Sequence, residues 1–208
     1  MRSYIHLKRP IALLLLAILL TAFSYLFLDM SVALSVHRVT RSSELLTRAT
    51  SNIPDLLLSI VIIVTTLSWT GYFLLVRRGI QNRHTRFLRT CGTVLPVAFV
   101  AKTVFQYVFG RTDPYLWVFY HHLPHFHWFR IDEGYGCFPS GHMTVFTALG
   151  VTLSHYHPRY RLFFLGSLIL LGLLLIATDY HFVSDVTSGA FLGYVVALIA
   201  STETLLKR

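Results

Sequence analysis

Short segments of this 208-residue chain carry side chains that could together transfer a phosphoryl group. One segment reads Ser140-Gly141-His142, and another contains His181 followed four residues later by Asp185. If a helix begins near His181, the carboxylate lies one turn from the imidazole and can hold it in one tautomer. The other ring nitrogen is then free to attack phosphorus, and a second histidine can protonate the leaving oxygen. The spacing predicts His181 as nucleophile, Asp185 as its orienting acid and His142 as general acid.

A further segment supplies positive charge for a tetrahedral anion. Lys102 stands in an otherwise apolar stretch, and Arg111 lies nine residues further along, directly after Gly110. An ionisable group within an apolar segment of membrane-spanning length is costly, and its default interpretation is a functional site. Backbone N–H groups at a helix start bind phosphate, and a glycine lets the backbone approach the anion closely. We therefore predict that Lys102, Arg111, Ser140 and Gly141 bind the substrate phosphate, with no metal and no cofactor.

Long apolar stretches must position these groups. Only 13% of the residues are charged and 54% are hydrophobic, whereas about a quarter of a soluble domain is charged. Uncharged stretches of about 18 residues or more can cross a ~30 Å hydrocarbon core as helices, and irregular backbone cannot face lipid. We predict an all-α integral membrane bundle that forms a single domain over 1–208, with its catalytic core at about 90–200. The six predicted transmembrane helices are 11–28, 56–76, 90–109, 142–154, 162–178 and 186–206.

Basic residues gather on one side of these spans. Of the 18 Lys and Arg, 12 fall in the terminal segments and in the loops that share their side, and 5 in the other loops. Because cytoplasmic loops are enriched in Lys and Arg, we expect both termini in the cytoplasm, at a plasma membrane or bacterial inner membrane. Loops 29–55, 110–141 and 179–185, and with them the site, then face outward. This clustering in short loops excludes nucleic acid as a partner and indicates contact with membrane lipids.

Two smaller observations bear on packing. The last predicted span contains Gly189, Ala190 and Gly193, and such small residues let a neighbouring helix approach closely in lipid. The two cysteines, Cys91 and Cys137, fall at opposite ends of the predicted bundle. A disulfide needs α-carbons within about 7 Å, so we expect both cysteines to be unpaired.

The motifs resemble those of the type 2 phosphatidic acid phosphatase superfamily. The segment Phe-Pro-Ser-Gly-His at 138–142 is similar to that family's second signature. His181 and Asp185, followed by Val186 and Gly189, resemble the end of its third. The resemblance covers roughly residues 90–200 and implies a helical bundle with an outward-facing site that dephosphorylates a lipid phosphate or pyrophosphate. It also implies a phosphohistidine on His181, and the roles already given for Asp185, His142, Ser140 and Gly141.

The sequence departs from the family pattern at two signatures. The Ser-Arg pair that usually begins the third signature is replaced by Leu174-Leu175, so one phosphate-binding arginine is missing. In the first signature, Lys102 stands nine residues before Arg111, and alignment on Arg111 puts Gln106 at the lysine position. Nine helical steps turn Lys102 and Arg111 to opposite faces, so both reach one phosphate only if the helix ends near Gly110. Lys102 and Gln106 share a face.

Three functions from different classes remain open. The motifs favour a phosphatase that hydrolyses a lipid phosphate or pyrophosphate at the outer face of the membrane. A lipid phosphotransferase would use the same nucleophile but pass the phosphate to an acceptor lipid. A non-catalytic lipid-binding or transport protein could keep the scaffold, and the missing arginine favours that alternative. Phosphatidic acid, phosphatidylglycerol phosphate, a polyprenyl phosphate or pyrophosphate and a lipid A phosphate are all candidate substrates, and the oligomeric state is unknown.

The outer loop also carries a tract rich in histidine and aromatic residues. Its histidines are His121, His122, His125 and His127. Such tracts can bind zinc, and aromatic residues with polar tips also form belts at the headgroup level. We prefer a third interpretation, in which the tract is a lid over the lipid headgroup. The polar contacts of that lid would be Arg130, Asp132 and Glu133.

Overall fold

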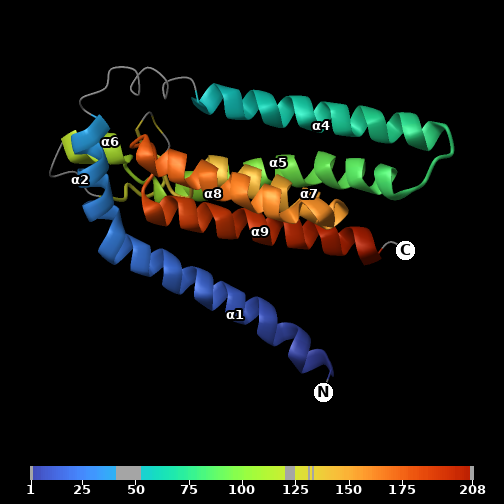
Figure 1. The fold of residues 1–208 in the computed structure, drawn as a ribbon, viewed down its shortest axis with the longest axis horizontal. Helices are drawn as coiled ribbons and strands as arrows, with labels where there is room; N and C mark the ends of the chain where they lie inside the picture. The colour runs from blue at the N-terminus through green and yellow to red at the C-terminus, as the bar shows by residue number, and fades with distance from the viewer. Residues whose placement is uncertain (1, 41–52, 120–124, 131, 133, 207–208) are drawn as a thin grey trace.

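The computed structural model describes residues 2–40, 53–119, 125–130, 132 and 134–206. Within these ranges every extended regular element is a helix (Figure 1), which confirms the all-α prediction. The helices are α1 (Arg2–Phe23), η1 (Ser24–Leu28), α2 (Asp29–Thr40), α4 (Ile53–Arg77), α5 (Arg83–Phe109), α6 (Pro114–Phe119), α7 (Gly141–Tyr156), η2 (Pro158–Tyr160), α8 (Arg161–Ala177) and α9 (Val183–Leu206).

Five helical segments among the described residues are long and apolar enough to cross a membrane. They are Ala12–Val39, Leu57–Arg77, Arg83–Phe109, Pro158–Ala177 and Val183–Ala200. The remaining predicted span, 142–154, corresponds to α7, which has 16 residues. At ~1.5 Å per residue a helix of that length falls short of a ~30 Å hydrocarbon core. The number of six spans therefore stays a prediction.

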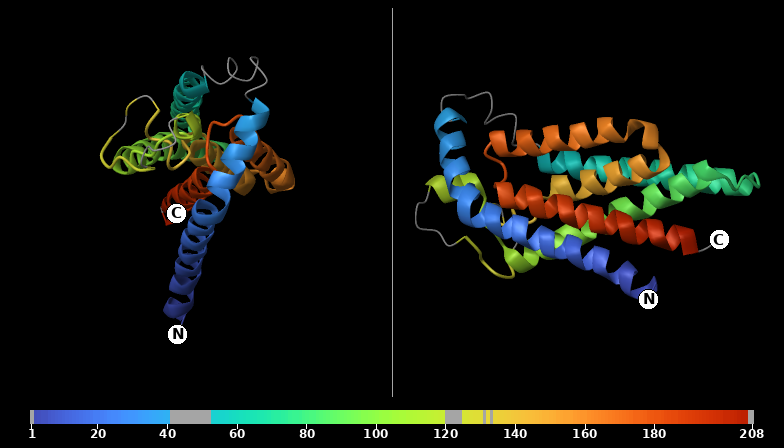
Figure 2. Two further views of the ribbon diagram at one scale, coloured as in Figure 1. Left: turned by 90° about the vertical axis from the view of Figure 1, so that its left-hand side faces the viewer. Right: turned by 60° about the horizontal axis from the view of Figure 1, so that its bottom comes forward.

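The helices form one elongated bundle. Helices α5, α7, α8 and α9 lie along one direction, with α4 on one flank and α1 diverging on the other (Figures 1 and 2). The closest packing joins α7 to α9, α4 to α5, and α5 to α7. The buried core between these helices contains Val94, Leu95, Ala98, Val145 and Ala148. Both termini lie at one end, and α2 and α6 lie at the other (Figure 1).

Two sequence signals bound α5. At its start, the Asn82 side chain accepts hydrogen bonds from the backbone N–H groups of His84 and Thr85. The hydroxyl of Thr85 accepts one from the backbone N–H of Asn82, which completes a capping box. At its end, Gly110 adopts a left-handed conformation with φ of 49°. A Cβ at Gly110 would lie 1.9 Å from the carbonyl oxygen of His127. Helix α5 therefore ends at Phe109, as the predicted span 90–109 does, and only glycine fits at position 110.

Glycines bring α7 and α9 into close contact. A Cβ at Gly189 would lie 2.5 Å from the carbonyl oxygen of Ser140, and one at Gly193 would lie 2.2 Å from that of Thr144. These separations leave no room for a larger side chain. The close approach predicted from the small residues of the last span is confirmed.

The N-terminal helix continues beyond the boundary expected from the sequence. Residues 29–55 were expected as a loop, but 29–40 are helical and form α2, so that part of the prediction is wrong. The π-helical turn η1 joins α1 to α2. The segment has no glycine or proline, and Ala33 and Leu34 pack against Trp117, Val118 and Phe182. The segment mixes polar and apolar residues, so its composition alone did not indicate a helix. Burial of its apolar face against the neighbouring elements stabilises the helix.

Candidate active site

Arg111 occupies the centre of a buried polar cluster at the α2 and α6 end of the bundle. Its side chain is 0% exposed. Its Nη1 donates to the hydroxyl of Ser184 and to Oδ1 of Asp185, both at 2.6 Å, and its Nη2 donates to Oδ2 of Asp29 at 2.7 Å. The guanidinium carbon also lies 4.3 Å from the ring centre of Phe182. The sequence predicted that Arg111 binds the substrate phosphate, whereas in the structure both of its terminal nitrogens bind carboxylates.

Asp29 is the charged residue of this cluster that was not predicted from the sequence. It is 1% exposed, and besides Arg111 it accepts hydrogen bonds from the backbone N–H and the hydroxyl of Ser184. The sequence interpretation ended the first span at residue 28 and placed Asp29 in an outer loop. An acidic residue at the edge of a long apolar stretch is itself a signal for a paired, functional group. Its partner could not be found from local sequence, because Arg111 is 82 residues away.

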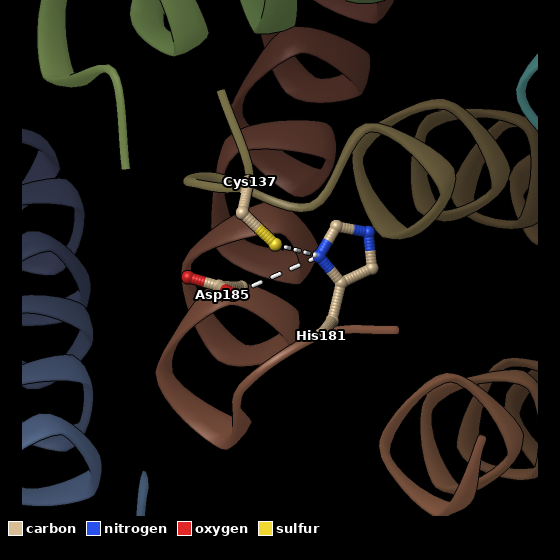
Figure 3. Close-up of side chains that lie close together, drawn as sticks. All are labelled: Cys137, His181 and Asp185. Atoms are coloured by element: carbon tan, nitrogen blue, oxygen red, sulfur yellow. Dashed lines mark hydrogen bonds and ion pairs between the residues drawn. The ribbon is translucent and has the colours of Figure 1, made fainter. Parts of the chain in front are cut away.

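His181 and Asp185 face each other at the start of α9, as their spacing predicted. Nδ1 of His181 lies 3.7 Å from Oδ2 of Asp185 and 2.9 Å from Sγ of Cys137 (Figure 3). The other ring nitrogen points away from both groups (Figure 3). Asp185 is 0% exposed, and its Oδ2 also accepts a hydrogen bond from the backbone of Phe182. Asp185 is therefore held by Arg111 on one oxygen and faces the imidazole with the other.

The start of α7 lies directly beside His181. Ser140 caps the helix by accepting a hydrogen bond from the backbone of Met143, and its own N–H donates to the carbonyl of Asp185 at 2.9 Å. This backbone bond ties the second motif to the third. The ring centres of His142 and His181 are 6.2 Å apart, and both residues are largely buried. The two predicted catalytic histidines are therefore neighbours.

Lys102 reaches the same helix start from α5. Its Nζ donates to Oε1 of Gln106 at 3.1 Å, and Nε2 of Gln106 donates to the carbonyl of Pro139 at 3.1 Å. A Cβ on Gly141 would lie 3.1 Å from Cδ of Lys102, so the lysine side chain passes over this glycine. Lys102 and Gln106 share a face of α5, as the sequence indicated. The structure thus brings Lys102, rather than the guanidinium nitrogens of Arg111, to the N-terminus of α7.

Burial shifts the pKa of several groups in the loops around the site. It raises the pKa of the Asp113 carboxyl to about 6, although that carboxyl accepts a hydrogen bond from the backbone of Leu116. Burial also raises the pKa of the Tyr180 hydroxyl to about 12 and that of the Cys137 thiol well above its ordinary value. At neutral pH Cys137 is therefore a thiol.

The histidine and aromatic tract lies only partly within the described residues. His121, His122 and Glu133 lie outside them. His125 stacks on Trp117 with ring centres 5.2 Å apart, and His127 meets Tyr135 edge-on at 4.7 Å. Arg130 and Asp132 form an exposed ion pair with each other at 2.6 Å. The lid over a headgroup stays a prediction.

In the part of the chain that the structure describes, a different group of residues could hold a metal ion. Cys137, His181 and Asp185 each offer one ligand atom, and these atoms all lie within 4.8 Å of one another. All three residues are buried, and the two cysteines of the chain are free. The sequence motifs predict no metal, and their spacing does not connect Cys137 with His181.

Comparison with known proteins assigns the family. No curated protein and no solved structure matches this chain. The family model described as PAP2 superfamily matches residues 87–205, which is more than half of the chain and includes His142, His181 and Asp185. The matched region begins within α5 and ends within α9. The chain therefore belongs to the PAP2 superfamily, whose members are phosphatases.

Proposed function

We propose that this protein hydrolyses a lipid phosphate or pyrophosphate at the outer face of a membrane through a phosphohistidine intermediate. The observation that carries the proposal is the meeting of His142 and His181, 6.2 Å apart between ring centres, beside the Lys102 side chain at the start of α7. A family of phosphatases and a set of apolar helices are consistent with a phosphorylated lipid as substrate.

In the first step His181 attacks phosphorus with the ring nitrogen that points away from Asp185. The new bond joins this nitrogen to phosphorus, and the bond from phosphorus to the leaving oxygen breaks. His142 donates a proton to that oxygen. The Nδ1–H of His181 faces Asp185, so the carboxylate stabilises the positive charge that develops on the ring.

In the second step a water molecule attacks phosphorus and displaces His181. His142, now without its proton, accepts one from the water molecule as the oxygen attacks. The bond between phosphorus and His181 breaks, and inorganic phosphate leaves with the enzyme restored. Each histidine ends the cycle in its starting protonation state, so no external acid, base or metal is required.

The phosphate oxygens are bound by the ammonium of Lys102 and by the backbone N–H groups at the start of α7, after Ser140 and Gly141. These donors meet the charge that accumulates on the equatorial oxygens in the transition state. Arg111 acts indirectly, because its terminal nitrogens hold Asp29 and Asp185. With Leu174 and Leu175 in place of the usual Ser-Arg pair, Lys102 is the principal side-chain cation for the substrate.

The outer location follows from the charge bias and the position of the site in the bundle. The site lies at the end of the bundle opposite both termini (Figure 1). Most of the Lys and Arg residues outside the spans belong to the terminal segments and to the loops on their side. Positively charged segments tend to stay in the cytoplasm, and this supports a site on the opposite face.

Phosphate release from a defined panel of lipids tests this function. Purified protein in detergent would be given phosphatidic acid, phosphatidylglycerol phosphate, a polyprenyl pyrophosphate and a lipid A phosphate, with and without a chelator. We expect release from at least one lipid in either condition, and a phosphoprotein intermediate that is labile to acid. The His181→Ala variant should lose both signals by several orders of magnitude, since it lacks the nucleophile. His155→Ala, an exposed histidine at the other end of α7, is the control. Near-normal release by His181→Ala would refute the mechanism.

A further inference from the structure

Cys137, His181 and Asp185 form a compact buried group at the proposed nucleophile (Figure 3). Cys137 comes from the loop before α7, whereas His181 and Asp185 come from the start of α9. We propose that these three side chains bind a soft divalent cation such as Zn²⁺, and that the bound ion reversibly switches the phosphatase off. The inhibitory part of this inference rests on the proposed function, but the binding part does not.

The three side chains are close to the geometry that zinc requires. Zinc binds thiolate sulfur at about 2.3 Å and imidazole nitrogen at about 2.0–2.1 Å in a tetrahedral arrangement. Such a site separates sulfur from nitrogen by about 3.5 Å and nitrogen from oxygen by about 3.3 Å. The observed separations are 2.9 Å between Sγ of Cys137 and Nδ1 of His181, and 3.7 Å between Nδ1 and Oδ2 of Asp185. Movements of about half an ångström, which small side-chain rotations supply, would bring these two separations to the values of a zinc site. The third separation, between Sγ of Cys137 and the ligand oxygen of Asp185, is at most 4.8 Å.

The charge of the surrounding cluster also favours a cation. Arg111 carries one positive charge, while Asp29 and Asp185 carry one negative charge each, and all three are at most 1% exposed. The buried cluster is therefore left with one negative charge when His181 is neutral. A divalent ion together with a Cys137 thiolate adds one positive charge and makes the assembly neutral. Neutrality lowers the cost of burying charge.

Asp185 is positioned for this role by its existing partners. Its Oδ1 is bound by Arg111, so Oδ2 is the oxygen turned toward His181 and Cys137. Oδ2 accepts a hydrogen bond from the backbone of Phe182, and a carboxylate oxygen has a second lone pair that can bind a metal. Arg111 thus orients Asp185 in the way that hydrogen-bonding neighbours orient the carboxylates that bind metals in other proteins.

Binding of the ion has two chemical consequences. At Cys137 the sulfur–hydrogen bond breaks and one proton is released as the sulfur–metal bond forms. A metal on Nδ1 also requires the neutral ring to carry its proton on the other nitrogen. That nitrogen then has no lone pair with which to attack phosphorus. Metal binding and formation of the phosphohistidine therefore exclude each other.

Cobalt is a direct probe of this site. Full-length protein purified in detergent and freed of metal would be titrated with Co²⁺, whose bond to a thiolate produces a charge-transfer absorption in the near ultraviolet. We expect one Co²⁺ per chain, displaced by Zn²⁺, with an affinity that rises about tenfold per pH unit because one proton is released. Cys137→Ser and Cys137→Ala should abolish the absorption. Cys91→Ser, which removes the other buried cysteine, should retain it. Absence of the absorption in the unaltered protein would overturn the site.

Inhibition is measured on the same proteins. Zinc should inhibit phosphate release from the unaltered protein and from Cys91→Ser, and a chelator should restore it. Loss of a hydrogen-bonding neighbour of a metal ligand lowers the metal affinity by roughly 10–100-fold, and loss of a direct ligand lowers it by more. The zinc concentration for half inhibition of each Cys137 variant, scored against its own metal-free activity, should therefore rise by at least this factor.

The outcomes separate this inference from the proposed function. Equal inhibition of the Cys137 variants, or activation by zinc, would contradict the inhibitory site while the phosphatase stands. Cobalt binding through Cys137 in a protein that releases phosphate from no lipid would support the metal site and contradict the proposed function instead.

Discussion

At the residue scale, the cations of the site divide into two kinds. Arg111 binds two carboxylates and is fully buried, whereas Lys102 binds a neutral amide and lies over Gly141. Because the terminal nitrogens of this guanidinium already donate to carboxylates, they are poorly placed to donate to a substrate phosphate as well. The ammonium of Lys102 can exchange the amide of Gln106 for a phosphate oxygen and gain a charge-assisted hydrogen bond.

Replacement of Lys102 tests this division. We expect Lys102→Met to lower kcat/KM by more than about tenfold, because a hydrogen bond to a charged group contributes about 1.5–3 kcal/mol. Gln106→Ala should have a smaller effect, since its neutral amide would donate a weaker bond. Steady-state kinetics on the preferred lipid would measure both, and wild-type kinetics in Lys102→Met would exclude the lysine from the site.

Asp29 should affect catalysis through Arg111 and Asp185. In Asp29→Asn, Arg111 loses one of its two carboxylate partners and is attracted more strongly to Asp185. This attraction pulls the Asp185 carboxylate away from His181. We expect the rate of phosphohistidine formation to fall by more than about tenfold, with KM little changed, because Asp29 does not touch phosphate. Asp29→Glu, which keeps a carboxylate, should recover part of the rate, and Gln81→Ala, at an exposed residue in the loop between α4 and α5, is the control. A loss of thermal stability with unchanged kcat would leave Asp29 a structural role only.

Asp113 should make stability depend on pH. Burial raises the pKa of its carboxyl from 3.8 to about 6, so the folded protein binds this proton more tightly than the unfolded chain. The folded state therefore loses stability as pH rises from about 4 through about 6. Asp113→Asn avoids this loss, and we expect the variant to be more stable by about 1–3 kcal/mol at pH 8 but no more stable at pH 4. Thermal unfolding in detergent at both pH values measures the difference. A gain that is independent of pH would contradict this account.

At the element scale, the contact between α7 and α9 aligns His142 and His181, the two proposed catalytic histidines. Helix α7 begins beside His142, and α9 begins just after His181, so the separation of the helices sets the separation of the rings. Gly189 and Gly193 allow the backbones to approach. The bond from the N–H of Ser140 to the carbonyl of Asp185 then fixes how the helix starts meet.

A methyl group at this contact should disturb both stability and activity. The Cβ introduced by Gly193→Ala would lie 2.2 Å from the carbonyl oxygen of Thr144, so the helices must separate. Overpacking of this kind typically costs about 1–3 kcal/mol. We expect a lower melting temperature in detergent and a lower kcat. Gly166→Ala, on α8 with nothing within 4 Å of the added Cβ, is the matched control and should be neutral or stabilising. Equal effects of the two substitutions would exclude a steric cause.

At the scale of the whole molecule, the N-terminal helices complete a site that the matched family region does not contain by itself. Asp29 lies at the start of α2, outside residues 87–205, yet it binds Arg111 and Ser184 within them. Further along α2, His37 binds Asp179 at 2.8 Å, two residues before His181. Helix α2 therefore contacts the segment around His181, the proposed nucleophile, at two points.

The arrangement of the bundle predicts which segments are reached from outside the cell. Single cysteines would be introduced at Gln81, in the loop between α4 and α5, and at Asp132, near the site, both of which are exposed. A maleimide that does not cross membranes should label Asp132→Cys in intact cells and Gln81→Cys only after permeabilisation, because the basic loops stay in the cytoplasm. The native cysteines are buried, so the unaltered protein is the background. The reverse pattern would place the site in the cytoplasm.

The sequence by itself determined the features that depend on local composition and spacing. Apolar length predicted the five helical segments that are long and apolar enough to cross a membrane, but not that the helix continues through residues 29–40. The spacing of His181 and Asp185 predicted that they would meet. Gly110 predicted the end of α5, since a left-handed residue there is a local requirement. The motif at 138–142 indicated the family that the match over residues 87–205 establishes.

Only the tertiary structure decided which distant groups share the site. The pairing of Asp29 with Arg111, the approach of Cys137 to His181 and the passage of Lys102 over Gly141 all join different elements. Sequence periodicity reports which face of a helix is apolar, but not which other helix covers it. A buried charge is stable only beside its partner, so the role of Arg111 depended on a carboxylate 82 residues away.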